Sequence, residues 1–166
     1  ITVSQANTID SSTTGTITAS IATDSTVDSL VTLTGNNAYT IVINASDATG
    51  NTANDLNTID AATSVQVDAS QITDISGNYA DIIDLYSSDG VFGLDNEDIS
   101  ITDELTVTQA NILDDLTTSA INATIENTRV SDLLGSTSLS NANSNNAYAI
   151  SISQEDAAVS ASNLNA

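Results

Sequence analysis

The chain has no cysteine, histidine, proline, methionine or tryptophan, and only seven of its 166 residues are glycine. Without a histidine base or a cysteine thiol, a Ser-His-Asp triad, thiol chemistry and zinc ligation by imidazole or thiolate are excluded. No glycine-rich phosphate loop is present. Carboxylate pairs can hydrolyse glycosides, but 22 acidic residues produce such pairs by chance, and aromatic residues that would stack on sugars are scarce. We therefore expect no enzymatic activity.

Positive charge is almost absent. Arg129 stands against 22 Asp and Glu residues, so the formal net charge is −21 at pH 7. Nucleic acids are bound through Lys and Arg, and anionic lipid surfaces repel acidic chains, so we expect neither as a partner. No apolar run approaches the roughly 20 residues of a membrane-spanning helix. High salt shortens the Debye length to about 3 Å at 1 M, so a saline exterior would screen the repulsion well.

The first residue is Ile1, and no signal peptide precedes the periodic sequence. This start indicates a processed product or a segment of a longer protein. The lack of cysteine and methionine also leaves nothing that oxidises easily. Together with the acidity, these features predict an extracellular or cell-surface bacterial protein.

A short motif recurs along the chain. ANTID at 6–10 resembles LNTID at 56–60 and ANILD at 110–114, and the sequence closes inside the same motif. The asparagines of the motif are separated by 50, 54 and 54 residues, at Asn7, Asn57, Asn111 and Asn165. Low complexity in Ser, Thr and Asn is the alternative explanation. We predict one domain over 1–166, with three repeats at 7–56, 57–110 and 111–164.

Each repeat contains two half-units, each a strand followed by a helix. Alternation of β-branched and polar residues predicts strands at 16–21, 39–43, 65–69, 99–102, 121–125 and 148–152. Spacing typical of helices predicts helical segments at 27–30, 72–86, 107–114 and 130–133. Ser70 and Asp103 are candidate helix-start residues, and residues 87–96 are predicted to form a loop.

Alternating strands and helices predict parallel strands joined by right-handed crossovers. Units this small cannot each bury a core, so they must stack and share one apolar interior. The fold class is therefore α/β: a repeat solenoid with parallel strands on one side and helices on the other. An all-β solenoid is the alternative, because several of the helical segments are short and rich in threonine.

The recurrent asparagine has two interpretations. It can be a ladder residue that hydrogen-bonds loop backbone in each repeat, since its amide offers both donors and an acceptor. It can equally be a polar position on the surface of a helix.

Acidic residues cluster most densely in the middle of the chain. Asp95, Glu97, Asp98 and Asp103 supply the oxygen ligands that calcium prefers. Calcium is the one cation that this sequence suggests, and no other cofactor is expected. A solvated acidic loop is the alternative, because the spacing matches no EF-hand.

The pattern A-N-x-[IL]-D-x-x-T-T, followed by Ala-[Ser/Thr]-Ile, is best preserved at 6–21 and 110–125. It resembles the tandem arrays in very long surface proteins of marine bacteria, cyanobacteria especially. The middle repeat departs from it, with AAT at 61–63 and VQV at 65–67. The resemblance implies an extracellular structural role and no catalytic residues.

Two functions follow as expectations. The first is a building block of a filament, sheath, surface layer or stalk, whose partner is another copy or repeat stacked head to tail. Its basis is that both ends of the sequence fall in the same phase of the repeat, which predicts uncapped apolar ends. The second is an adhesin-type module that recognises a carbohydrate or a surface, with calcium as a potential requirement.

Overall fold

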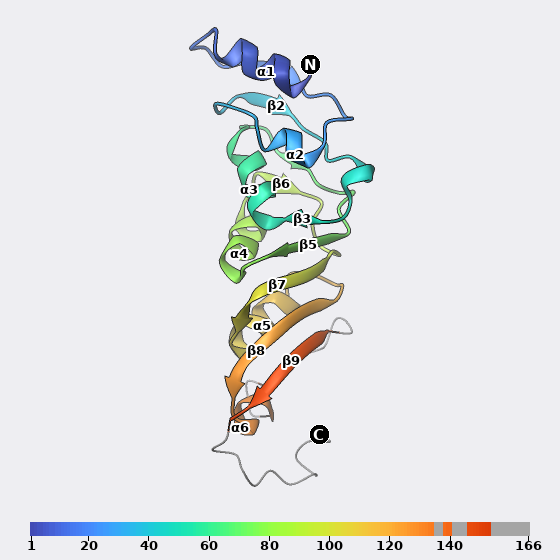
Figure 1. Cartoon of the computed structure of the whole chain (residues 1–166), viewed down its shortest axis with the longest axis vertical. Helices are drawn as coiled ribbons and strands as arrows, with labels where there is room; N and C mark the ends of the chain where they lie inside the picture. Colours follow the sequence, from blue (N-terminus) through green and yellow to red (C-terminus); the bar gives the residue numbers. More distant parts are fainter. Residues whose placement is uncertain (135–137, 141–145, 154–166) are drawn as a thin grey trace.

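The computed structural model describes residues 1–134, 138–140 and 146–153. The protein has a mixed α/β fold whose elements follow one another along the long axis, from α1 at one end to α6 and β9 at the other (Figure 1). Every strand pair in the described part of the chain is parallel. The mixed α/β class with parallel strands is thus confirmed, and the all-β alternative is wrong.

Short helices recur at nearly constant intervals. They are α1 (Val3–Asp10), α2 (Val27–Leu30), α3 (Ala53–Ala61), α4 (Tyr79–Ser87), α5 (Val107–Asp114) and α6 (Val130–Leu134), with a 3-10 turn at Ala45–Asp47. Their starts are 24, 26, 26, 28 and 23 residues apart. As a result, α1, α3 and α5 begin 50 and 54 residues apart, which are the spacings of the recurrent asparagines.

A polar residue caps the start of each of the first five helices. Its side chain accepts a hydrogen bond from a backbone N–H in the first turn, which satisfies a donor that the helix itself leaves open. These capping residues are Thr2, Thr26, Thr52, Asn78 and Thr106.

Ser70 and Asp103 do not start helices. Ser70 lies in a turn, and Asp103 lies within a strand. The helix predicted over 72–86 begins only at Tyr79, because Asn78 caps it and the preceding residues are extended. Ile72 and Ile75 share the spacing of a helix, which explains the incorrect prediction.

The strands form three parallel sheets rather than the single sheet that the alternation predicts. The largest sheet has the order β3-β5-β7-β8-β9, and the others pair β1 with β2 and β4 with β6. Isolated bridges link Asn37 to Thr63 and Val42 to Asp68, between the two small sheets. The strands are β1 (Thr18–Ser20), β2 (Ala38–Thr40), β3 (Asn51–Thr52), β4 (Val67–Asp68), β5 (Asp74–Gly77), β6 (Val91–Phe92), β7 (Asp98–Leu105), β8 (Ile121–Thr128) and β9 (Ala147–Ile152).

All six predicted strands are present in whole or in part, whereas β3, β5 and β6 were not predicted. β6 lies inside the segment 87–96 that was predicted to be a loop. These extra strands are only two to four residues long, so each shows too little alternation to be recognised in the sequence.

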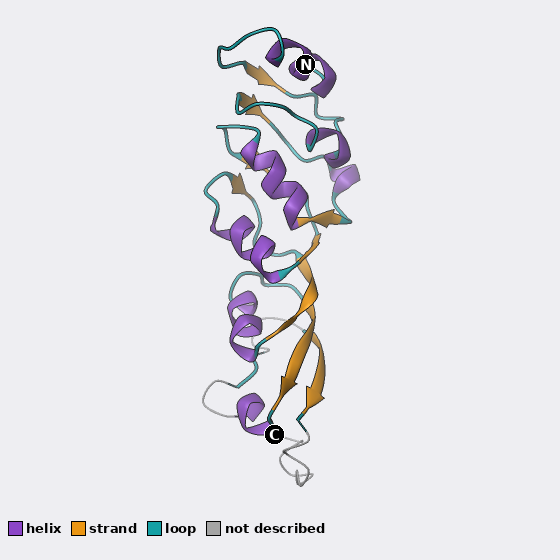
Figure 2. Ribbon diagram, turned by 60° about the vertical axis from the view of Figure 1, so that its left-hand side comes forward, coloured by secondary structure: helices purple, strands orange, loops and turns teal. Residues whose placement is uncertain are grey.

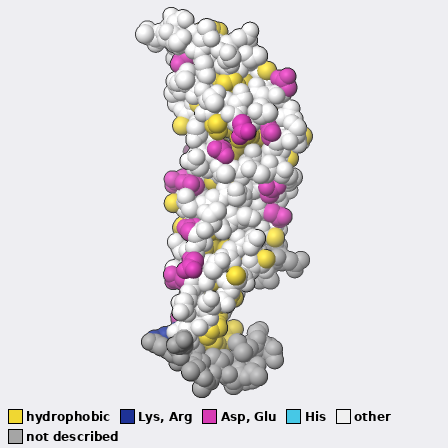
Figure 3. Space-filling view, viewed as in Figure 1, with side chains coloured by type: hydrophobic (Ala, Val, Ile, Leu, Met, Phe, Trp, Pro, Cys, Tyr) yellow, Lys and Arg dark blue, Asp and Glu magenta, His cyan; other side chains and the backbone are white. Residues whose placement is uncertain are grey.

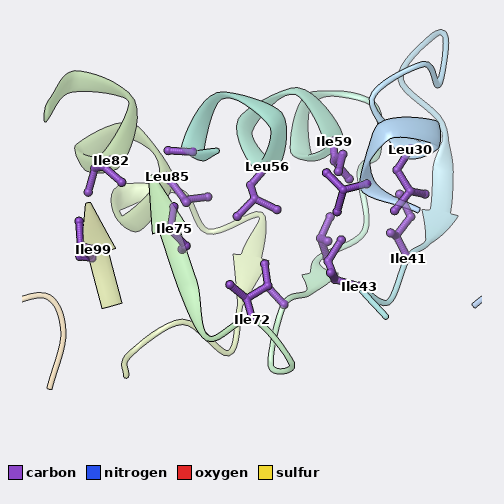
Figure 4. Close-up of a cluster of buried hydrophobic side chains, with 14 of the residues drawn as sticks. Leu30, Ile41, Ile43, Leu56, Ile59, Ile72, Ile75, Ile82, Leu85 and Ile99 are labelled. Atoms are coloured by element: carbon purple, nitrogen blue, oxygen red, sulfur yellow. The ribbon is translucent and has the colours of Figure 1, made fainter. Parts of the chain in front are cut away.

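One aliphatic interior runs through the stack. Figure 4 shows its side chains projecting from helices on one side toward side chains of strands and loops on the other, and Leu56, Ile75, Ile82, Leu85 and Ile99 are all at most 1% exposed. Toward the C-terminal end, helices line one side and the long strands the other (Figure 2). Among the described residues, every helix is too short or too polar to cross a lipid bilayer.

Candidate functional site: the junctions between successive coils

We call the segment from the start of one helix to the start of the next a coil. The recurrent asparagine lies on the helix of its coil, half-buried, and reaches into the following coil. Asn7 Nδ2 donates to the carbonyl of Thr32 at 2.8 Å, and its Oδ1 accepts from the backbone N–H of Thr34 at 3.0 Å. One amide therefore satisfies a donor and an acceptor of the neighbouring backbone.

The other recurrent asparagines that the structure describes also bond the backbone of the following coil, Asn111 through both amide atoms and Asn57 through Nδ2. Asn111 Nδ2 donates to the carbonyl of Ser138 at 2.9 Å, and its Oδ1 accepts from the N–H of Ser140 at 2.7 Å. Asn57 Nδ2 donates to the carbonyl of Asp81 at 3.0 Å. Asn165 lies outside the described residues. The two interpretations of this asparagine are compatible, because it occupies a helix position and also bonds the next coil.

An aspartate three residues later forms a second link across the same junction. Asp10 accepts from Thr34 Oγ1 at 2.8 Å and from Asn37 Nδ2 at 2.9 Å. Asp114 accepts equivalent bonds from Ser140 Oγ and Asn146 Nδ2, both at 2.6 Å. The hydrogen bonds from Asn37 and Thr34 lower the pKa of Asp10 below its usual value.

In the middle repeat, the corresponding aspartate has fewer hydrogen-bond partners among the described residues, because the facing residues differ. Asp60 accepts from Ser88 Oγ at 2.7 Å. A Cβ at Gly90 would lie only 1.7 Å from Asp60 Oδ1, so this carboxylate fits only against a glycine. The junction therefore keeps its aspartate while its partners change.

The sequence NNAY, which occurs at 36–39 and 145–148, provides the partner of this aspartate. Asn37 Oδ1 also accepts from the N–H of Ile17 at 2.9 Å, and Asn146 Oδ1 accepts from the N–H of Ile121 at 2.8 Å. Each of these asparagines thus reaches the start of a strand in the preceding coil. The same arrangement occurs twice, 104 residues apart when measured from Ile17 to Ile121.

The tyrosine of NNAY lies beside this network. Burial, followed by the negative charge of Asp114, raises the pKa of Tyr148 to about 12. Burial and the charge of Asp10 raise the pKa of Tyr39 in the same way. The Tyr148 hydroxyl also accepts from Asn146 Nδ2 at 3.1 Å, so this tyrosine is part of the network.

Further carboxylates near the end of a coil accept the first backbone N–H of the same coil. Asp47 accepts from Val27 at 3.0 Å and Asp103 accepts from Tyr79 at 2.9 Å, each at the first residue of a helix. Negative charge at a helix N-terminus is stabilising, because the first N–H groups have no partner within the helix. These acids join the end of a coil to its own first helix in addition to charging the surface.

The four residues predicted to bind calcium are engaged separately. Asp98 accepts from Ser119 Oγ and from the N–H of Ala120 at 3.0 Å, and these two bonds lower its pKa. Glu97 is fully buried and accepts from Tyr86 Oη at 2.7 Å and from the N–H of Asp95 at 3.0 Å.

The Asp103 carboxylate accepts a hydrogen bond from the backbone N–H of Tyr79 at the start of α4, and the Asp95 side chain is exposed. In the described ranges, no three acidic side chains are grouped so that they could hold a metal ion. The sequence placed these carboxylates close together along the chain, whereas the fold directs them to different partners.

The outer surface is polar and offers no concentrated acidic patch on the face seen in Figure 3, where Asp and Glu are spread along the length. Shallow grooves separate successive helices. The one between α1 and α2 is lined mainly by small polar side chains, including Ser4, Thr8 and Ser29. The chemistry of this site is therefore hydrogen bonding between coils.

Sequence reasoning identified the recurrent asparagine but missed its partners and those of the aspartate three residues later. Thr34, Ser88 and Ser140 carry no motif, and only the repeated NNAY gave a signal for Asn37 and Asn146. No protein-family model matches the chain, and neither a curated protein nor a solved structure shows significant similarity to it.

Proposed function

We propose that this chain is a non-enzymatic, extracellular structural repeat protein. In this proposal it is a solenoid whose coils stack head to tail and build a filament, sheath, surface layer or stalk. Its partner is a further copy or a further repeat of its own kind. Apart from the buried Glu97 and Asp114, the carboxylates of the described residues lie at least partly exposed, where a saline medium screens them.

The observation that carries the proposal is the repeated chemistry of the junctions. Asn7 and Asn111 each bond the backbone of the following coil through both ends of the amide. Asp10 and Asp114 add a second link three residues later. Bonds that join each coil only to its neighbour are what a linear array requires.

The interior supports the same proposal. Each coil contributes a slice of aliphatic side chains to a row that continues through the stack. Because each slice is covered by its neighbours, coils can be added without changing the cross-section. Such a protein can be extended along one axis at constant width, which suits a filament or a stalk.

Electron microscopy of the purified 166-residue protein at low and high salt tests the proposal. We expect rods or filaments of constant width that lengthen when salt screens the net charge of −21. Dispersed single molecules at every salt concentration would contradict self-assembly. Selective binding on a glycan array, without assembly, would favour an adhesin-type module instead.

A further inference from the structure

We draw no further inference here: the strongest candidate, the surface row in which the parallel register places the exposed Val42 and Phe92 on either side of Asp68, is a patch for which nothing in the structure shows what covers it.

Discussion

At the scale of single residues, the different hydrogen-bonding capacities of asparagine and aspartate explain how the junctions between coils are held. An asparagine amide donates and accepts, so it bonds both a carbonyl and an N–H of the next coil. An ionised aspartate only accepts, so it is matched with hydroxyl, amide or backbone donors. The recurrent pair Asn7 and Asp10 uses both capacities within one turn of helix.

Removing one junction amide should cost stability. Asn57→Ala deletes the hydrogen bond to the carbonyl of Asp81 at an internal junction, and we expect a loss of about 1 kcal/mol in the free energy of unfolding. Asn54→Ala is the control, since Asn54 is exposed on the same helix and alanine favours helices. Urea denaturation measures both; equal effects of the two variants would argue against a structural role for the junction amide.

The lowered pKa of Asp98 predicts a dependence of stability on pH. Its hydrogen bonds to Ser119 and Ala120 favour the charged form, so their contribution is present above the ordinary pKa of 3.8 and is lost as the pH falls through the lower folded value. Asp98→Asn should therefore be less stable than the unaltered chain near neutral pH.

This difference should shrink on acidification below about pH 4, as measured by urea midpoints across the pH range. Asp24→Asn is the control, because Asp24 is exposed and its carboxylate has no hydrogen bond within the described residues. A difference in urea midpoint between Asp98→Asn and the unaltered chain that does not change with pH would contradict the link between the protonation of Asp98 and stability.

At the scale of elements, the helices depend on their surroundings. They are four to nine residues long, which is too short for an isolated helix to be stable in water. Polar caps satisfy their first N–H groups, and burial of one face against neighbouring coils supplies the remaining stability of each helix. A helix in this protein is therefore a consequence of stacking more than of local propensity.

Two glycines in turns allow a comparison that tests the packing between elements. Gly93 has a φ of +88°, and an added Cβ would lie 2.8 Å from the backbone of Ser70. Gly50 has a φ of +79° with nothing within 4 Å of an added Cβ. Gly50→Ala should cost about 1–2 kcal/mol for the backbone conformation alone. Gly93→Ala should cost about 1–3 kcal/mol more, because the turn at Ser70 must also shift.

Thermal and urea denaturation of the two alanine variants measure this difference. Equal losses would show that the close approach of Gly93 to Ser70 is not tight in solution.

At the scale of the whole molecule, charge of one sign dominates. A net charge of −21 is spread along an elongated body, and carboxylates such as Asp10, Asp98 and Asp114 are held by N–H and O–H donors of a neighbouring coil. Those bonds stabilise the individual charges, but the longer-range repulsion between them remains. Salt should relieve it by shortening the Debye length.

The melting temperature should therefore rise as sodium chloride increases toward about 1 M. Melting temperatures in calcium chloride and in magnesium chloride at matched ionic strength distinguish charge screening, which both salts provide equally, from specific binding of calcium. Equal effects of the two divalent salts would argue against a calcium site involving Asp95, Glu97, Asp98 and Asp103. A melting temperature that does not respond to any salt would contradict the electrostatic account.

The sequence by itself determined the period, most of the element types and the chemistries for which it has no residues. Asparagine spacing and β-branched alternation are local properties, so they predicted most strands and four of the helical segments. The sequence could not predict where α4 begins, because Ile72 and Ile75 fit a helix as well as the strand they join.

Tertiary structure alone decided which polar groups meet. Partners such as Asn7 and Thr34 lie 27 residues apart, and their meeting depends on loop lengths and strand register. The same register directs Glu97 to Tyr86, Asp98 to Ala120 and Asp103 to Tyr79, although the three acids are neighbours in the sequence. Hydrogen bonds are short-ranged and directional, so only the assembled stack selects them.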